Sequence, residues 1–147
     1  MDCVFCMRRS DPALAAHRQV WEFEKSILWV ADHQAFPGYC VLALKDHVKE
    51  MHDLSLEDQH KVLREMMLVG RTLENLFSAD KINYASYGNM VPHLHWHIFP
   101  RKIGDLAWPS PPWVKMSEFN QYPHTPESLE NLKEMIRSFL SQTELEN

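Results

Sequence analysis

Three histidines alternate with apolar residues near the middle of the chain: His93, His95 and His97 are separated by Leu94 and Trp96. Because successive side chains of a strand point to opposite faces, we expect a strand that places all three imidazoles on one face. Repulsion between protonated rings favours the neutral form near pH 7, and neutral imidazole is a nucleophile that attacks phosphorus. The spacing therefore predicts a catalytic pocket.

Two other interpretations of this pattern are open. His-x-His on a strand can place two nitrogens on one zinc ion, which would make the chain a zinc-dependent hydrolase. A catalytic zinc needs a third ligand and a nearby base, and the segment from Ile82 to Arg101 contains no Asp or Glu. The other alternative is a stripe of histidines on a solvent face, although nothing in sheet packing favours imidazole three times.

The residues around the triad predict short apolar strands, the first of which make a meander or hairpin. Pro37-Gly38 is a turn signal between two of them. We expect two strands within residues 19–32 and one strand each over Tyr39–Lys45, Lys81–Tyr87 and His93–Phe99, the last ended by Pro100.

Helices are predicted on either side of these last strands. Ser55 followed by two acids is typical of a helix start, and an apolar stripe continues to Phe77. This helix has apolar surface for a partner subunit, or it is fully buried in one domain. Asp105–Pro126 contains five prolines and should be extended and irregular. Thr125 and Pro126 then open a terminal helix.

Composition excludes several classes of protein. The chain has 147 residues, which fits one domain, and a net charge of -5, which argues against nonspecific nucleic-acid binding. Its four glycines are too far apart for a Walker loop or a GxGxxG fingerprint. With no apolar run of membrane length and no signal-peptide core, we expect a cytoplasmic protein without a membrane partner. Three cysteines cannot pair completely and should be reduced thiols.

The run His93–Phe99 resembles the motif of the histidine triad (HIT) family, and more particularly its Hint/Fhit-like nucleotide hydrolases of bacterial type. The resemblance extends from Cys3 to about Arg101, through Asp32, Pro37-Gly38 and Lys45-Asp46-His47. It implies an α+β, HIT-like fold with a mostly antiparallel sheet of about five strands, a long helix and an additional C-terminal helix. Residues 1–147 would form one HIT-like domain, with a core over about 1–103, and the protein would be a homodimer.

The resemblance also implies an activity. His95 would be the nucleophile on the α-phosphorus of a nucleoside 5′-phosphate derivative, such as a dinucleoside polyphosphate or a phosphoramidate. His97 would bind a phosphate oxygen and assist the leaving group, and His93 would orient the other two. Asp32 stands where relatives contact a ribose. The chemistry, a nucleotidyl transfer to histidine and then to water, would need no cofactor.

Two features depart from the family pattern, one at Tyr39 and one in the connection before His93. Tyr39 stands where relatives commonly have a further histidine, as either a hydrogen-bond donor or a packing residue. Asn89 stands near the usual glutamine and binds phosphate in this interpretation, while Met90 stands near the usual serine or threonine and cannot donate a hydrogen bond. These departures leave open a slow or non-catalytic nucleotide-binding regulator.

Zinc-bearing relatives imply a structural zinc on Cys3, Cys6, His47 and His93, with the N-terminus folded over the sheet. The alternative is a flexible terminus with two free thiols. Arg101 and Lys102, just after the triad, either lower the potential at an anionic substrate or form a solvated surface pair.

Overall fold

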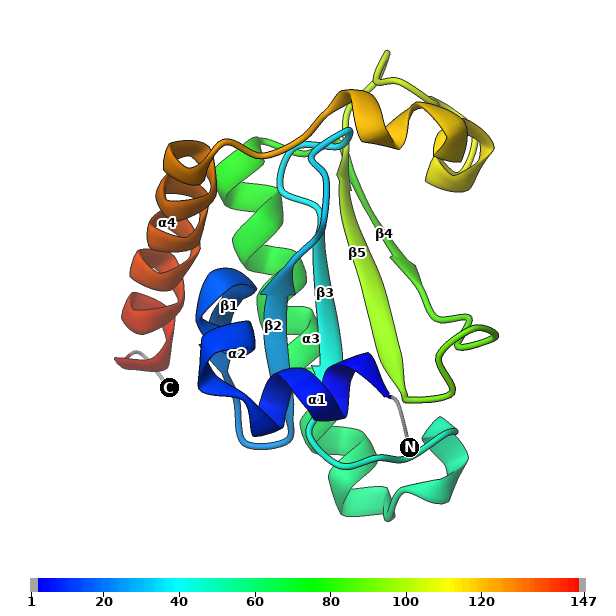
Figure 1. Cartoon of the computed structure of the whole chain (residues 1–147), viewed down its shortest axis with the longest axis vertical. Helices are drawn as coiled ribbons and strands as arrows, with labels where there is room; N and C mark the ends of the chain where they lie inside the picture. The colour runs from blue at the N-terminus through cyan, green and yellow to red at the C-terminus, as the bar shows by residue number, and fades with distance from the viewer. Residues whose placement is uncertain (1–2, 146–147) are drawn as a thin grey trace.

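The computed structural model describes residues 3–145 as an antiparallel five-stranded sheet with helices on both faces, which confirms the predicted α+β class (Figure 1). The sheet order is β1-β2-β3-β5-β4, and all neighbouring strands run antiparallel. The strands are β1 (Gln19–Glu22), β2 (Ser26–Val30), β3 (Cys40–Leu44), β4 (Lys81–Ala85) and β5 (His95–Arg101).

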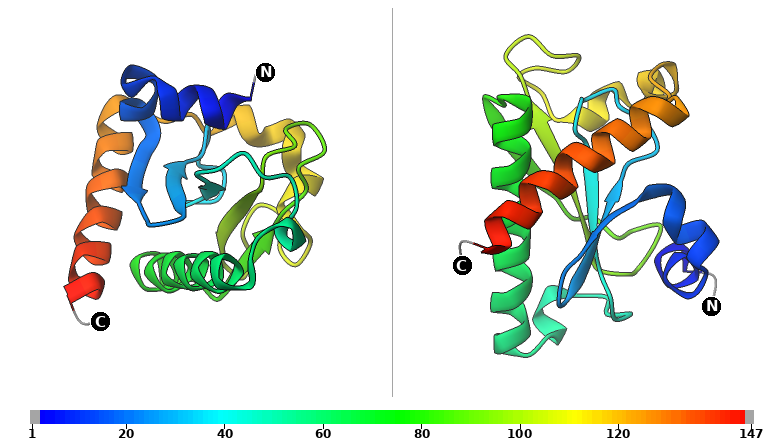
Figure 2. Two further views of the ribbon diagram at one scale, coloured as in Figure 1. Left: turned by 90° about the horizontal axis from the view of Figure 1, so that it is seen from below. Right: turned by 90° about the vertical axis from the view of Figure 1, so that its left-hand side faces the viewer.

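Helix α3 (Leu56–Phe77) covers one face of the sheet (Figure 2). Ser55 Oγ caps it by accepting a hydrogen bond from the Asp58 amide at 3.1 Å, as the sequence predicts. Its inner face, which includes Val69 and Leu73, packs in one core with Trp96 of β5. The apolar face of the triad strand is therefore turned toward α3, and its histidine face is turned away from it.

The N-terminal segment lies across the opposite face as two short helices, α1 (Val4–Ser10) and α2 (Pro12–Arg18) (Figure 2). Asp11 separates the two helices and accepts a hydrogen bond from the Ala13 amide at 2.9 Å, which explains why a second helix begins directly. Phe5 anchors α1 through its buried ring.

The triad strand differs from its predicted bounds at both ends. β5 begins at His95, two residues later than expected, and continues past Pro100 to Arg101. Pro100 is tolerated because pairing with β3 ends at Ile98, so no ladder bond from its nitrogen is lost on that side. β4 also ends early, at Ala85, which leaves residues 86–94 as a loop that contains His93.

The proline-rich segment is more ordered than predicted. It contains a 3-10 helix, η2 (Pro112–Gln121), in place of an irregular stretch. Arg101 contacts the start of this segment, and the alternative of a solvated surface pair is wrong for Arg101. Its guanidinium is buried and donates to Asp105 at 2.7 and 2.9 Å and to the Ser110 carbonyl at 3.0 Å. Lys102 is exposed.

Helix α4 (Pro126–Leu145) closes the β1 edge of the sheet. Thr125 Oγ1 accepts from the Ser128 amide at 3.1 Å, which confirms the predicted cap. Lys133 and Arg137 donate to backbone carbonyls of residues 16–17 and 19–20, so this edge is not available to another strand.

A short 3-10 turn, η1 (Met51–Asp53), precedes α3. None of the helices described is both long and apolar enough to cross a membrane.

Candidate active site

His95 lies at the start of β5 with its ring held in one tautomer. Its Nδ1 atom is 2.6 Å from the carbonyl oxygen of His93. A carbonyl oxygen only accepts, so Nδ1 of neutral His95 carries the ring proton and Nε2 carries a lone pair. Within residues 3–145 no hydrogen bond reaches Nε2. The ring is therefore prepared to attack an electrophile with Nε2.

His97 lies two residues further along β5, with ring centroids 5.1 Å from His95. Burial, and secondarily the neighbouring His95, lowers the pKa of His97 to about 4. This imidazole is therefore neutral at physiological pH. Together, His95 and His97 confirm the alternation for these two rings, because Trp96 between them packs on the α3 side.

Tyr39 directly precedes β3, the strand next to β5, and its side chain contacts His97. Its hydroxyl oxygen is 2.6 Å from Nδ1 of His97, and its ring stacks on Phe99 with centroids 4.0 Å apart. Burial raises the pKa of Tyr39, so the phenol keeps its proton. The sequence left open a donor role and a packing role, and this side chain has the geometry for both.

His93 does not share the pocket with the other two imidazoles, and the expectation of three rings on one strand face was wrong for it. Its Nε2 donates to the carbonyl of Leu44 at 2.7 Å, which leaves a lone pair on Nδ1. That Nδ1 faces the sulfur of Cys3 at 3.3 Å and Nδ1 of His47 at 3.2 Å. The physical reason is the later start of β5: His93 belongs to the loop, where strand alternation does not apply.

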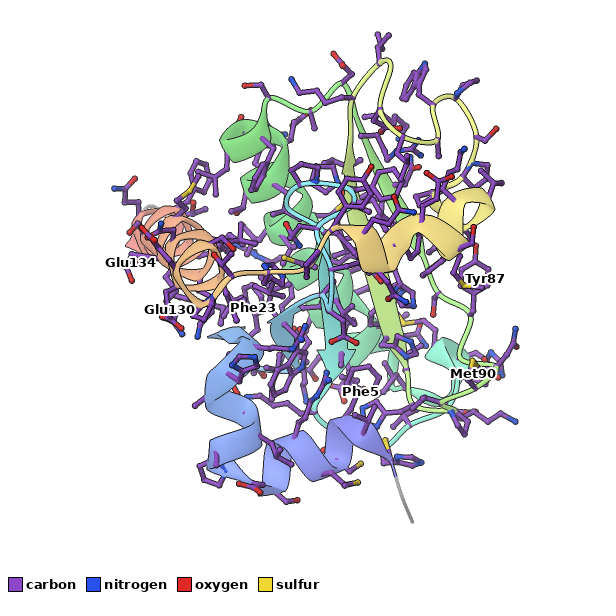
Figure 3. The ribbon with its side chains drawn as sticks, turned by 45° about the horizontal axis from the view of Figure 1, so that its top comes forward. Phe5, Phe23, Tyr87, Met90, Glu130 and Glu134 are labelled. Carbon is purple, nitrogen blue, oxygen red and sulfur yellow. The ribbon has the colours of Figure 1, made fainter. Side chains whose placement is uncertain are left out.

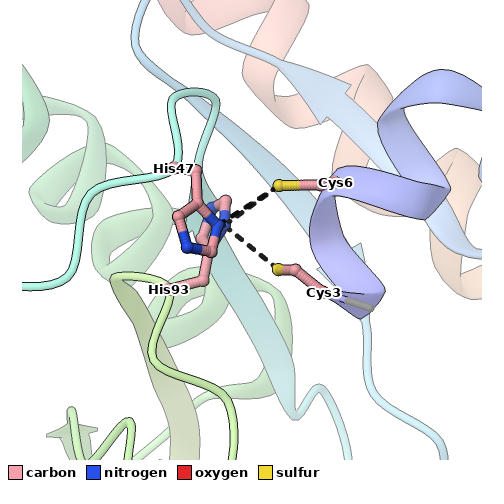
Figure 4. A group of neighbouring side chains, drawn as sticks. All are labelled: Cys3, Cys6, His47 and His93. Carbon is pink, nitrogen blue, oxygen red and sulfur yellow. Dashed lines mark hydrogen bonds between the residues drawn. The ribbon is translucent and has the colours of Figure 1, made fainter. Parts of the chain in front are cut away.

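The side chains of Cys3, Cys6, His47 and His93 form one cluster, with each donor atom within 4.8 Å of the others (Figure 4). Cys6 Sγ lies 3.4 Å from Nδ1 of His47 and 3.6 Å from Nδ1 of His93. A tetrahedral zinc with ordinary bond lengths has sulfur–nitrogen edges of about 3.5 Å and nitrogen–nitrogen edges of about 3.3 Å. The donor set and spacing thus fit a four-coordinate ion.

The ring of Phe5 contacts both this cluster and His95. Phe5 lies on α1 between the two cysteines, and its ring is 5.3 Å from the His93 ring and 4.8 Å from the His95 ring. Sequence reasoning missed Phe5 as a site residue. The available signal was its position inside the Cys-x-x-Cys spacing, which fixes where its ring lies once the cysteines are placed.

Two cavities open on the histidine face. The first, named here the Met90 cavity, has a volume of about 670 Å³ and is lined by residues 87–91, His95, His97 and Trp113. The second, the Asp32 cavity, has a volume of about 340 Å³ and is lined by Val4, Phe5, Arg8, residues 29–33, Tyr39, Val41, His97 and Trp113. Both are of a size that holds small ligands, and they share His97 and Trp113.

The remaining predicted residues divide between these cavities. Asn89 lines the Met90 cavity, while Asp32 and Tyr39 line the other. Asp32 forms an ion pair with Arg18 at 2.7 Å, and its side chain is largely exposed. Sequence reasoning missed Tyr87 and Trp113. A proline pair opening a helical turn before Trp113 was the available signal.

A HIT domain model matches residues 14–104. A histidine triad protein from Marinobacter aquaeolei VT8 is 31% identical with a TM-score of 0.75, covering 90% of this chain and 95% of that one. Another, blr8122 from Bradyrhizobium japonicum, is 28% identical with a TM-score of 0.73, covering 87% and 94%. This chain belongs to the histidine triad family.

Curated relatives match a shorter stretch. A bis(5′-adenosyl)-triphosphatase of Saccharomyces cerevisiae is 32% identical over 82 residues, which cover 49% of this chain and 40% of that protein. The chain thus spans about two fifths of the length of the curated relatives it matches first. Membership of the family accounts for the fold and for the triad motif.

Proposed function

We propose that this chain is a HIT-type nucleotide hydrolase that acts at the α-phosphate of a nucleoside 5′-phosphate derivative through a covalent nucleotidyl-histidine. The observation that carries the proposal is the His95 tautomer: a backbone carbonyl 2.6 Å from Nδ1 leaves the lone pair on Nε2 at the wall of the Met90 cavity. The related triphosphatase in yeast is named for a substrate of this general class.

In this proposal His95 and His97 have different roles in the reaction. His95 Nε2 forms a bond to the α-phosphorus, and the bond from phosphorus to the leaving group breaks with its electron pair on the leaving atom. With Tyr39 donating to Nδ1 of His97, the ring proton of neutral His97 lies on Nε2 and can bind a phosphate oxygen. Water then attacks phosphorus and gives up a proton to solvent, while the phosphorus–nitrogen bond breaks and its electron pair returns to His95 Nε2. This step releases the nucleoside 5′-monophosphate and restores His95.

His93 is a positioning residue in this scheme. Its carbonyl oxygen fixes the His95 tautomer, so orientation of the nucleophile comes from the backbone of His93 and not from its imidazole. We place the nucleoside in the Asp32 cavity, whose polar groups Arg8, Asp32 and His33 can meet ribose hydroxyls. Asn89, in the other cavity, can donate its amide to phosphate oxygens.

The cysteine and histidine cluster supports a structural zinc. Its four donors complete a tetrahedral shell, whereas a catalytic zinc keeps one position open for water or substrate. His93 Nε2–H donates to a backbone carbonyl, the usual support for a metal-bound histidine. The bound ion would hold α1, and with it Phe5, against the sheet. This donor set favours the triad mechanism over a zinc-dependent hydrolase.

A homodimer is supported by the outer face of α3. Leu56, Leu63 and Met67 lie seven and four residues apart, so they share one face, and they are exposed by 67%, 47% and 45%. Three large apolar side chains on one helix face are typical of an interface. The strand β4 at the sheet edge is next to this helix in the fold.

The function is tested with adenosine 5′-phosphoramidate and the variant His95→Ala. We expect the wild-type protein to release AMP, and the variant to lose turnover by a factor on the order of 10⁴ while AMP binding, measured by calorimetry, changes little. Nucleotide binding without wild-type turnover would instead identify a binding regulator.

A further inference from the structure

Cys3 and Cys6 lie on one face of α1, so their sulfur atoms can reach each other. Cys3 is the N-cap residue of the helix and Cys6 is three positions later, a spacing that makes side chains neighbours on a helix surface. Both sulfurs belong to the group of donor atoms that lie within 4.8 Å of one another. Two thiols in a Cys-x-x-Cys arrangement can form a disulfide. The pair therefore has an alternative to binding a metal.

Zinc binding and disulfide formation exclude each other at this pair. The thiolate is the metal ligand, and a disulfide has no thiolate. Two sulfurs bound to one tetrahedral zinc are about 3.8 Å apart, whereas two sulfurs in a disulfide are about 2.05 Å apart. The disulfide would leave only His47 and His93 of the four donors, which is too few for a closed structural site.

The two thiols differ in their access to solvent. Cys3 is 5% exposed, whereas Cys6 is partly exposed. An oxidant in solution therefore meets Cys6 first, and Cys3 is placed behind it as the resolving thiol. Cys40 is fully buried in the core on the α3 side of the sheet, so it does not compete for Cys6.

The two ends of α1 are held by different interactions. In its last turn, Arg9 donates to the Lys45 carbonyl at 2.6 Å, and Arg8 lies 3.9 Å from the Asp32 carboxylate. These contacts need no metal. The first turn, residues 4–7, is held instead by the cysteine and histidine cluster and by one aromatic ring. Loss of a bound zinc should therefore release the first turn while the rest of the chain stays folded.

That aromatic ring belongs to Phe5. Its side chain lies between α1 and the sheet (Figure 3). The ring is 4.8 Å from the His95 ring and lines the Asp32 cavity, in which we place the nucleoside. Movement of the first turn would thus remove an apolar part of the cavity wall.

We propose that Cys3 and Cys6 are a redox switch: a peroxide converts the zinc-bound thiolates to a disulfide, zinc leaves, and the first turn of α1 moves away from the Asp32 cavity with Phe5. The switch rests on the proposed zinc site and nucleoside cavity, and it adds regulation to them.

The oxidation has two steps. The Cys6 thiolate attacks one peroxide oxygen, the oxygen–oxygen bond breaks and hydroxide leaves, which produces a sulfenic acid. The Cys3 thiolate then attacks the Cys6 sulfur, and the sulfur–oxygen bond breaks with release of a second hydroxide. Two electrons pass from the sulfurs to the peroxide, and two protons from solvent convert both hydroxides to water.

The test treats the zinc-loaded wild-type protein with hydrogen peroxide and follows metal and thiols. A chromophoric chelator should detect release of about one zinc per chain, and two of the three thiols should disappear. The tryptic peptide that ends at Arg8 contains both cysteines, and it should become lighter by two hydrogens. Dithiothreitol with added zinc should reverse these changes. Cys40→Ala is the matched control and should release zinc as the wild type does.

Binding of AMP, measured by calorimetry, tests the effect on the cavity without requiring turnover. Oxidation should weaken AMP binding by about 10-fold, as loss of an aromatic contact allows. Phe5→Ala should bind AMP weakly before treatment and change by less than about 2-fold on oxidation. Met7→Ala, on the same helix but 50% exposed and outside the Asp32 cavity, is the matched control and should respond as the wild type does.

Amide hydrogen exchange shows where the chain opens. Oxidation should accelerate exchange in residues 4–7 and leave α4 and the sheet unchanged, because their contacts do not involve the cluster. Faster exchange throughout the sheet would mean that the chain unfolds, which would contradict a local switch.

Other results would also overturn the switch. These are a wild-type protein that binds no zinc, zinc that is retained after peroxide treatment, a sulfinic acid in place of the disulfide, and AMP binding that does not change on oxidation. If the expected results are all obtained but the protein does not hydrolyse adenosine 5′-phosphoramidate, the proposed hydrolase activity is wrong and the switch stands.

Discussion

The carbonyl oxygen of His93 lies 2.6 Å from Nδ1 of His95, while the imidazole of His93 belongs to the cysteine cluster. One residue therefore contacts His95 through its backbone and belongs to the candidate metal-binding cluster through its side chain. Phe5 makes a second connection, because it contacts both rings from the helix that carries the cysteines. A substitution in the cluster should therefore alter the position of the His95 ring.

The first prediction concerns zinc. Protein purified without chelator should contain about one zinc per chain, and chelation should lower both its melting temperature and its turnover, because α1 loses its attachment. Cys3→Ser should lose the metal. Cys40→Ala is the matched control, since Cys40 is a buried thiol outside the cluster, and it should keep the metal. A metal-free protein whose melting temperature does not respond to added zinc would contradict this.

The second prediction concerns Tyr39. Tyr39→Phe keeps the ring on Phe99 but removes the hydroxyl that contacts His97. One neutral hydrogen bond is worth about 1 kcal/mol, so kcat should fall by about 5-fold with little change in KM or melting temperature. Tyr39→His restores a hydrogen-bonding group and should recover most of kcat. Equal kcat values for the wild type and the Phe variant would show that this contact does not orient His97.

The third prediction concerns stability and pH. The folded protein holds the pKa of His97 at about 4, below the value of 6.5 expected in the unfolded chain. Between these values the unfolded state binds more protons, so the free energy of unfolding should decrease as the pH falls from 6.5 to 4, by at most about 3 kcal/mol from this group.

His97→Gln isolates this contribution. Denaturant titrations at pH 7 and pH 4.5 should show a smaller loss of stability in the variant than in the wild type. The same loss in both proteins would mean that His97 does not titrate as its burial requires.

The fourth prediction concerns assembly. Light scattering should give a mass of about 35 kDa, twice the chain mass of 17.3 kDa. Met67→Glu should shift the protein toward the monomer, because it places a charge on the outer face of α3. Met135→Glu on α4 is the matched control, since Met67 and Met135 are both 45% exposed. A monomer at micromolar concentration in the wild type would refute the dimer.

Much of this arrangement could be predicted from local sequence. The alternation at His95, Trp96 and His97 fixes two faces of one strand, and it was correct because all three residues lie inside β5. The caps of Ser55 and Thr125 were also correct, since a cap depends on residues three positions away. Such features are local, so they can be recognised without knowing the rest of the fold.

The errors come from features that depend on distant contacts. His93 was assigned to a strand because its spacing matches, but the start of β5 depends on pairing with β3 and β4, which the triad spacing does not encode. The alternative of a solvated Arg101 was wrong because its partners Asp105 and Ser110 meet it only after the proline-rich segment folds back. Trp113 was missed for the same reason.

The central claim, that His95 forms a covalent intermediate, is tested most directly by rapid quench with a substrate labelled at the α-phosphate, followed by peptide mapping. The label should appear on the peptide that contains His95, remain stable in base and be lost in acid, as expected for a phosphorus–nitrogen bond, and His95→Ala should show none. Label on Tyr39 or on a cysteine, or wild-type turnover that persists within a factor of about ten in His95→Ala, would contradict the mechanism.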